Sequence, residues 1–236
     1  MKPNELNEIR CYLVEDHPLI RSYLELVLTK HFSGRLVGFS DSAAVAREEI
    51  FALKPDLVLT DLSLRAGHGL ELIKELRTLD RPPKILVLSG HDETAYAERA
   101  LHAGASGYLN KSASPAEVIV ALERILAGET YLSGPMAARI QQKGEPSPAS
   151  RALPSVEQFS DRELEVFELM GTGYDTRQIA EHLGIEAKTV DTYRSRIKEK
   201  LGIATTNGLR VAAFQWLSGS LGNDETARLK PISSTV

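Results

Sequence analysis

Cysteine is nearly absent from this chain. Among its 236 residues there is one cysteine, Cys11, which lies in the apolar run at residues 11–14. An intramolecular disulfide needs two cysteines, so a disulfide framework is excluded. A lone cysteine within an apolar run most often behaves as a small buried hydrophobic residue. We therefore expect Cys11 to belong to the core.

Long apolar segments are also missing. The first apolar runs have the length of strands and are followed by charged residues, whereas a membrane-spanning helix takes roughly 20 apolar residues. The first residues do not follow the pattern of a secretory signal. We expect a soluble, cytoplasmic protein with no membrane partner.

The chain has no large excess of charge of either sign. Its 28 basic and 32 acidic residues leave a formal net charge of -4. This balance argues against a wholly basic nucleic-acid coat protein, but it allows DNA binding through a local basic patch. The length suits about one or two domains of roughly 100 to 200 residues each.

Strand-length apolar runs alternate with helical patterns over the first half of the chain. Nearly continuous apolar runs of this kind suit a sheet that is buried on both faces. Ser114 and Glu117 form a capping-box pattern at the start of the fifth helix. The predicted strands lie at residues 9–14, 36–39, 57–60, 84–88 and 107–109, and the predicted helices at 18–32, 42–53, 69–79, 93–103 and 115–127. Five such units predict an α/β fold with a doubly wound, five-stranded parallel sheet.

The pattern changes beyond this region. Residues 144–150 are rich in Gly, Pro and Ser and read as a linker. Ser160 and Glu163 form a second capping-box pattern, and no strand pattern follows them. We therefore predict a small all-α domain. The predicted boundaries are 8–130 for the first domain, 131–157 for a linker with a short helix at 135–142, 158–219 for the second domain and 220–236 for a flexible tail.

Polar residues follow four of the predicted strands. Asp61 ends the run at residues 57–60, and the pair Glu15 and Asp16 follows the first strand; Ser89 and Lys111 follow the fourth and fifth. The carboxyl ends of parallel strands meet at one edge of a sheet, which is where open α/β sheets place their sites. The sequence thus predicts three carboxylates, a hydroxyl and an ammonium group in one place.

These groups suit phosphoryl chemistry. Three neighbouring carboxylates resist full ionisation unless a cation lies among them. Mg²⁺ prefers oxygen ligands and pairs with phosphate oxygens. One carboxylate can then attack a phosphoryl group while Lys111 neutralises its oxygens. Asp61, central in strand order, is the expected nucleophile.

The arrangement over residues 9–127 resembles the receiver domain of two-component response regulators, a flavodoxin-like fold. The resemblance implies that Asp16 and Asp61 bind Mg²⁺ directly, that the carbonyl of Ser63 is a further ligand and that Glu15 acts through water. It also implies that Ser89 and Tyr108 form the switch that responds to phosphorylation, and that Lys111 assists it.

The second domain contains a helix-turn-helix pattern. A helix that ends at Leu183 is followed by a turn through Gly184 and a second helix from about Ala187. The second helix is rich in basic residues and is the expected DNA reader. The expected core of the helix-turn-helix comprises Ile179, Ala180, Leu183, Ile185, Val190, Ile197 and Leu201.

This domain, over roughly residues 158–218, resembles the LuxR-type helix-turn-helix. With a receiver before it, the chain is similar to NarL/FixJ-family response regulators. Base edges are the expected partners of Lys188, Thr189, Asp191, Thr192 and Ser195, whereas phosphates or packing are expected for Tyr193, Arg194, Arg196 and Lys198. Asp191 would repel phosphate unless it accepts from cytosine or holds a neighbouring arginine. We expect Phe214 and Trp216 to lie in the core.

The predicted function is that of a DNA-binding transcriptional response regulator and not of an enzyme. Its expected partners are a sensor histidine kinase or phosphotransfer protein, double-stranded promoter DNA and, when Asp61 is phosphorylated, a second copy of the chain. One alternative is a transcription factor whose receiver works without phosphorylation. A phosphatase is disfavoured because Ser63 stands where such an enzyme has a second acid. The six histidines show no metal-ligand spacing and read as surface or loop residues.

Overall fold

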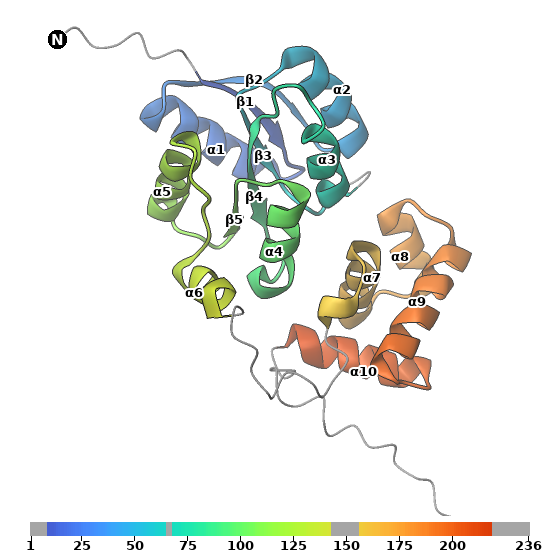
Figure 1. The fold of residues 1–236 in the computed structure, drawn as a ribbon. Coiled ribbons are helices and arrows are strands. Elements are labelled where there is room, and N and C mark those ends of the chain that lie inside the picture. Colours follow the sequence, from blue (N-terminus) through green and yellow to red (C-terminus); the bar gives the residue numbers. More distant parts are fainter. Residues whose placement is uncertain (1–8, 65–67, 143–155, 219–236) are drawn as a thin grey trace, which may run out of the picture. The chain divides into compact units, whose positions relative to one another are not determined.

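The computed structural model describes residues 9–64, 68–142 and 156–218. The chain divides into two compact units, Met1–Gly144 and Glu145–Val236, drawn in Figure 1. Each unit is described below by itself. The predicted linker at 144–150 and the predicted tail at 220–236 lie outside the described residues.

The first unit is built on a five-stranded sheet. Its strands are β1 (Ile9–Val14), β2 (Gly34–Ser40), β3 (Leu57–Thr60), β4 (Lys84–Ser89) and β5 (Gly107–Asn110). They pair in the order β2-β1-β3-β4-β5, and all the pairs are parallel. The four residues of β3, at the centre, are buried, as a sheet covered on both faces requires. The predicted fold class is confirmed.

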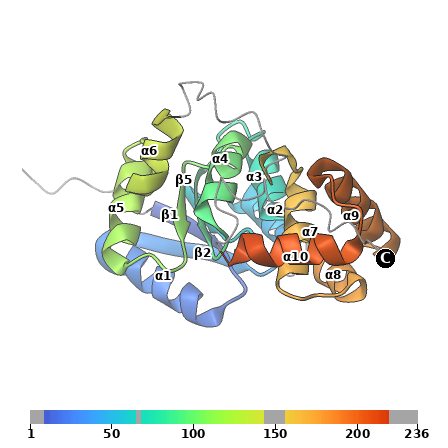
Figure 2. The ribbon, with the colours of Figure 1, turned by 90° about the horizontal axis from the view of Figure 1, so that it is seen from below.

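Helices cover both faces of this sheet. The five helices are α1 (Pro18–His31), α2 (Ala43–Leu53), α3 (Gly69–Leu76), α4 (Glu93–Ala103) and α5 (Pro115–Leu126). Figures 1 and 2 show α1 and α5 on one face, with α2, α3 and α4 on the other. Helix α3 ends three residues before its predicted end. The capping box predicted at Ser114 and Glu117 forms at the start of α5.

The first part of the predicted linker, from Tyr131, also packs on the first unit. Tyr131 is buried and forms a parallel bridge with Gly107 on the outer edge of β5. The helix α6 (Gly134–Gln142) follows and begins one residue before the predicted short helix. At its start, the Ser133 hydroxyl donates to the carboxylate of Glu93 on α4 at 2.7 Å. The segment therefore covers an edge strand that would otherwise expose unpaired backbone groups.

The second unit is helical in its described part. After the short 3₁₀ turn η2 (Val156–Gln158) come α7 (Asp161–Gly171), α8 (Thr176–Leu183), α9 (Ala187–Leu201) and α10 (Thr206–Leu217). The predicted capping box of Ser160 and Glu163 is present, and Asp175 forms another at α8.

Phe167 is the centre of this unit's aromatic core. Its ring contacts Phe159 at 5.2 Å and Trp216 at 5.9 Å between centroids. The expectation that Phe214 is buried was wrong, because 63% of its surface is exposed. Phe214 precedes Trp216 by two residues, about half a turn of α10, so the two side chains lie on opposite sides of the helix and only Trp216 faces Phe167. Within the described ranges, none of the helices combines the length and apolar character that a bilayer crossing requires.

Candidate functional site

Backbone hydrogen bonds place the predicted site residues together at the carboxyl edge of the sheet. The Asp61 amide donates to the carbonyl of Val14 at 2.9 Å, so the β1–β3 ladder continues one residue past β3. The Lys111 amide, just past β5, likewise donates to the carbonyl of Ser89, the last residue of β4, at 2.9 Å. Because neighbouring strands end level with each other, their first loop residues share one edge.

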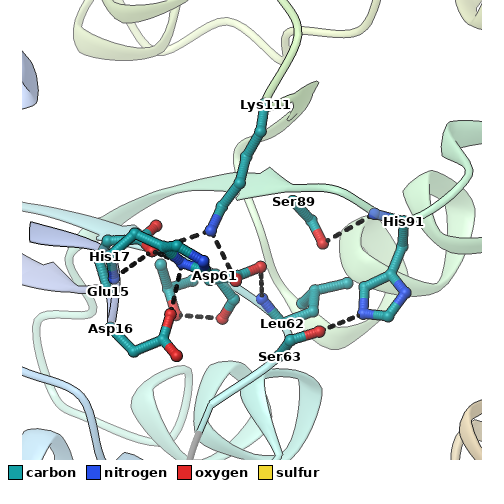
Figure 3. Close-up of polar contacts among 10 residues, drawn as sticks. Glu15, Asp16, His17, Asp61, Leu62, Ser63, Ser89, His91 and Lys111 are labelled. Carbon is teal, nitrogen blue, oxygen red and sulfur yellow. Dashed lines mark hydrogen bonds and ion pairs between the residues drawn. The ribbon is translucent and has the colours of Figure 1, made fainter. Parts of the chain in front are cut away.

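Lys111 joins two of the predicted acids. Its Nζ lies 2.8 Å from Oδ2 of Asp61 and 2.9 Å from Oε1 of Glu15 (Figure 3). Asp61 and Glu15 are nearly inaccessible to solvent, at 3% and 2% exposed. Burial alone lowers the pKa of Lys111, but the charges and hydrogen bonds of Asp61 and Glu15 outweigh it and raise that pKa. The ammonium group therefore stays charged between two buried carboxylates.

The backbone around Asp61 is tightly packed. Its Oδ1 accepts a hydrogen bond from the amide of Leu62 at 2.6 Å. Gly69, at the start of α3, lies so close that an added Cβ would be 2.5 Å from the carbonyl oxygen of Asp61. The beginning of α3 thus fixes the end of β3, and the carboxylate orientation follows from it.

The two predicted switch residues meet at the loop after β4. Ser89 is fully buried, and its hydroxyl accepts a hydrogen bond from the amide of His91 at 3.3 Å. Tyr108 is fully buried as well and donates through its hydroxyl to the carbonyl of His91 at 3.1 Å. The backbone of His91 therefore connects the hydroxyl groups of Ser89 and Tyr108.

Three histidines form specific contacts near the site that the sequence did not predict. His17 contacts Glu15 and Asp16, and His91 lies 2.6 Å from the Ser63 hydroxyl through Nε2 (Figure 3). His68 lies in the β3–α3 loop, as expected, but it is 2% exposed and accepts from the amide of Leu70 at the start of α3. Metal-ligand spacing missed them, but the position of His17 beside the acidic pair and of His91 two residues after Ser89 was a usable signal.

The donor set at the sheet edge fits a divalent cation. Glu15, Asp16 and Asp61 follow adjacent strands, and Lys111 supplies the single ammonium group seen among them. Carboxylate oxygens are the ligands that Mg²⁺ prefers. Glu15, Asp16 and His17 also have ligand atoms within 4.8 Å of one another.

The second unit presents a helix-turn-helix in α8 and α9. Gly184 adopts a left-handed conformation at φ 63° and allows the sharp turn that ends α8. Val190 and Ile197 of α9 are fully buried, and Ile179 of α8 lies with them in the core. Of the predicted core, Ile185 and Leu201 are half-buried. Most of the other residues of α9 are exposed or half-buried.

The residues predicted to contact DNA fall into an exposed group and a half-buried group. Exposed residues are Lys188, Asp191, Thr192, Ser195 and Arg196, and half-buried residues are Thr189, Tyr193, Arg194 and Lys198. Lys188, Thr189, Thr192, Tyr193 and Arg196 line one shallow depression with Glu186. These side chains follow each other at three- and four-residue spacing and so share a helix face.

Arg194 resolves the difficulty that Asp191 posed. Its guanidinium donates to the hydroxyl of Thr176 on α8 and lies 3.4 Å from Oδ1 of Asp191. Of the two alternatives for Asp191, a contact with cytosine or a neighbouring arginine, the structure shows the arginine. Lys200 is also used internally, because its Nζ lies 2.5 Å from Oε2 of the buried Glu163.

Comparisons with known proteins match both units. A family model described as "Response regulator receiver domain" matches residues 11–123, and one described as "Bacterial regulatory proteins, luxR family" matches residues 157–213. The transcriptional activator protein ExaE of Pseudomonas putida is 35% identical over 193 residues, which are 82% of this chain and 90% of ExaE. The transcription regulator BvgA of Bordetella pertussis is 32% identical over 81% of this chain and 90% of BvgA.

Solved structures show the same fold. RcsB of Salmonella enterica serovar Typhimurium, bound to the promoter rprA with the phosphomimetic BeF₃⁻, matches with a TM-score of 0.64 and 21% identity. That match covers 88% of this chain and 99% of RcsB. A LuxR-family regulator from Aurantimonas is 33% identical with a TM-score of 0.54, over 58% of this chain and 99% of its own.

Proposed function

Since this chain belongs to the two-component response regulators that join a receiver domain to a LuxR-type DNA-binding domain, we propose that Asp61 is its phosphoacceptor. Members of this family regulate transcription and are not enzymes. The observation that carries the proposal is the contact of the Lys111 ammonium with both Asp61 and Glu15, at the ends of three different strands. No other buried carboxylate of the described first unit has that combination of a central strand end and a lysine partner.

In the proposed reaction, an oxygen of Asp61 attacks the phosphorus of a phosphohistidine on a sensor kinase or phosphotransfer protein. The new O–P bond forms as the N–P bond breaks, and the histidine nitrogen leaves with its electron pair. Lys111 contacts the carboxylate oxygen Oδ2 and is placed to neutralise a phosphoryl oxygen. The amide of Leu62 holds the other carboxylate oxygen, Oδ1, and so orients the nucleophile.

The acidic residues fit Mg²⁺ as the cofactor. Asp16 and Asp61 would bind the ion directly, the carbonyl of Ser63 would complete the protein ligands and Glu15 would act through water, as the family resemblance implies. When bound, the ion neutralises negative charge on the phosphoryl oxygens during transfer.

The loop after β4 would respond to phosphorylation of Asp61. A phosphoryl group on Asp61 offers new acceptor oxygens to the Ser89 hydroxyl, which in this structure accepts from the amide of His91. A shift of Ser89 alters the loop whose carbonyl also holds the hydroxyl of Tyr108. Phosphorylation would thereby shift an existing equilibrium of the receiver and not create a new fold.

The output would be promoter DNA bound through α9. Lys188 and Arg196 are the exposed cations of the depression, and Thr189, Thr192 and Tyr193 lie with them. Asp191, Ser195 and Lys198 remain part of the proposed contact set, whereas Arg194 would act mainly by anchoring α9 to α8. A homodimer would place two such helices about one DNA turn, roughly 10 base pairs, apart.

The second unit also offers a surface for the proposed dimer. Val211, Phe214 and Leu217 of α10 are 43%, 63% and 37% exposed and follow one another at three-residue spacing. They form an apolar stripe, here called the α10 stripe. A second copy of the chain is the proposed occupant, and RcsB is a structural relative described as dimers on DNA.

The test compares the wild type with Asp61→Asn, using acetyl phosphate as phosphodonor in the presence and absence of Mg²⁺. Wild type should incorporate one phosphoryl group in a Mg²⁺-dependent way, bind promoter DNA more tightly afterwards and form dimers. Asp80→Asn, which changes an exposed acid after α3, should behave as the wild type. Full labelling of Asp61→Asn would overturn the assignment, and DNA affinity that does not respond to labelling would favour a phosphorylation-independent receiver.

A further inference from the structure

The loop between β1 and α1 holds an imidazole against the acidic pair. His17 Nδ1 lies 2.6 Å from Oδ1 of Asp16 and 3.0 Å from Oε1 of Glu15 (Figure 3). Within the described ranges, this is the one group of three metal-ligating side chains whose ligand atoms converge, within 4.8 Å of one another. The proposed Mg²⁺ set uses the two acids and leaves the histidine without a role.

Local backbone geometry holds this arrangement. His17 stands just before Pro18, the first residue of α1, in an extended conformation, and its side chain does not cap the helix. Its amide donates to Oε1 of Glu15 at 2.9 Å, and its ring contacts the same oxygen. Two contacts to one carboxylate turn the ring toward the acids. The side chain is still 64% exposed, so an ion can reach it from solvent.

The ligand chemistry distinguishes two classes of divalent ion. Mg²⁺ demands oxygen ligands and retains several waters. Zn²⁺ and its first-row neighbours accept imidazole together with carboxylate, and zinc sites with histidine and acidic ligands are common. One nitrogen and two carboxylates offer three ligands, which leaves a position for water.

We propose that Glu15, Asp16 and His17 form a binding site for Zn²⁺ or a similar nitrogen-accepting divalent ion, which competes with Mg²⁺ for the acidic pair. The competition follows because both ions would use the same carboxylates, and two dications cannot share them without strong repulsion. The consequence for phosphorylation rests on the proposed function: with Zn²⁺ on the pair, Mg²⁺-dependent labelling of Asp61 is inhibited.

Binding is tested by titrating Zn²⁺ alone into the full-length protein by calorimetry. His17→Ala should weaken Zn²⁺ binding at this site at least about tenfold, since even the outer-shell partners of metal ligands cost 10- to 100-fold. Mg²⁺ affinity should change far less than Zn²⁺ affinity in the variant, because Mg²⁺ does not take the imidazole as a ligand, and excess Mg²⁺ should displace Zn²⁺ from the wild type. His17→Gln retains a hydrogen-bonding side chain and should lose Zn²⁺ equally.

His102→Ala is the matched control, because it removes another exposed histidine, on α4, and should keep the wild-type Zn²⁺ site. Circular dichroism of each variant checks that the fold is intact. Equal Zn²⁺ affinity in wild type, His17→Ala and His17→Gln would overturn the proposal, as would Zn²⁺ that Mg²⁺ does not displace.

Labelling separates this proposal from the proposed function. Without Zn²⁺, wild type and His17→Ala should both be labelled by acetyl phosphate and Mg²⁺; failure there concerns Asp61 and leaves the Zn²⁺ titration valid. Added Zn²⁺ should inhibit the labelling of wild type far more than that of His17→Ala. Equal inhibition of both would contradict the competitive role of His17.

Discussion

At the scale of single residues, two lysines pair with buried carboxylates, one at the sheet edge and one in the helical unit. Lys111 is held by Asp61 and Glu15 at the site edge, and Lys200 is held by Glu163 in the helical unit. Each acid is buried, so each needs its cation. The first pairing lies at the proposed phosphorylation site, and the second connects two helices of the helical unit.

Lys111→Met should separate stability from phosphoryl transfer. Loss of the ammonium leaves two buried carboxylates without a counter-charge, which costs about 3 kcal/mol of unfolding free energy. The site becomes more negative, so its affinity for Mg²⁺ should rise while labelling by acetyl phosphate falls. Urea unfolding, Mg²⁺ titration and labelling measure the three effects.

The control for this prediction is Lys84→Met, which changes an exposed lysine at the start of β4. It should match the wild type in all three measurements. Undiminished labelling of Lys111→Met would show that the ammonium group is dispensable for transfer.

The Glu163–Lys200 pair predicts a dependence of stability on pH. Burial alone raises the pKa of Glu163, but hydrogen bonds from Lys200 and Ser160 and the lysine charge lower it below its ordinary value of 4.5. Stabilisation by a carboxyl of lowered pKa is complete above pH 4.5 and is lost as the pH falls through its pKa in the folded state. Glu163→Gln should therefore cost about 2 kcal/mol at pH 7 and progressively less below pH 4.5.

Fluorescence of Trp216, the only tryptophan, can follow unfolding of the second unit at each pH. Glu199→Gln, which changes an exposed acid on α9, serves as the comparison and should show little cost at any pH. A Glu163→Gln cost that is the same at pH 7 and pH 3.5 would refute the linkage.

At the scale of elements, contacts between chain segments decide where the active groups lie. Helix α3 begins against the end of β3, through Gly69 and the backbone of Asp61 and Leu62. Arg194 of α9 reaches Thr176 of α8, and Ser133 before α6 reaches Glu93 of α4. In each case a polar or small residue at the end of one element contacts another element and helps to fix its position.

Gly69→Ala should distort the site. The added methyl group would lie 2.5 Å from the carbonyl of Asp61 and 2.6 Å from the Cα of Leu62. Overpacking of this kind costs about 1–3 kcal/mol, and because the obstruction is backbone, the end of β3 must move. Labelling of Asp61 should fall along with stability. Gly134→Ala, where an added Cβ meets nothing within 4 Å, should keep both, and normal labelling of Gly69→Ala would argue against this constraint.

At the scale of the whole molecule, the chain joins a receiver domain to a LuxR-type DNA-binding domain. Its net charge of -4 gives no general attraction to nucleic acid, so the proposed DNA contacts depend on the local face of α9. A single small face of this kind binds weakly, and pairing of two copies supplies both affinity and half-site spacing. In the proposed function, the exposed α10 stripe is therefore as relevant to output as the basic residues of α9.

Phe214→Ser should weaken dimers and operator binding while leaving phosphorylation unchanged. Phe214 is 63% exposed, so its loss costs little folding energy in the single chain, whereas burial in a dimer would be worth about 1.5–3 kcal/mol per side chain. Analytical ultracentrifugation and gel shifts on two-half-site DNA measure the loss. Val45→Ser removes a comparably exposed side chain on α2 and should have no effect; unaltered dimers in Phe214→Ser would exclude the α10 stripe as the interface.

Prediction from sequence succeeded best where local patterns and strand ends coincide. The parallel sheet, the caps at Ser114 and Ser160 and the family were predictable, because apolar periods and capping residues are local signals. The structure brings Lys111 to Asp61 and Glu15, as strand order implied. The roles of individual site and DNA-contact residues stay predictions until they are tested.

The sequence by itself determined the α/β and helical units, the acids at strand ends and the basic reading helix, since each depends on residues close together in the chain. Only the tertiary structure decided that Phe214 is exposed, that His68 is buried, that Arg194 reaches Thr176 of α8 and that Tyr131 covers the edge of β5. These outcomes depend on contacts between distant elements, where packing and charge pairing override the average behaviour of a residue type.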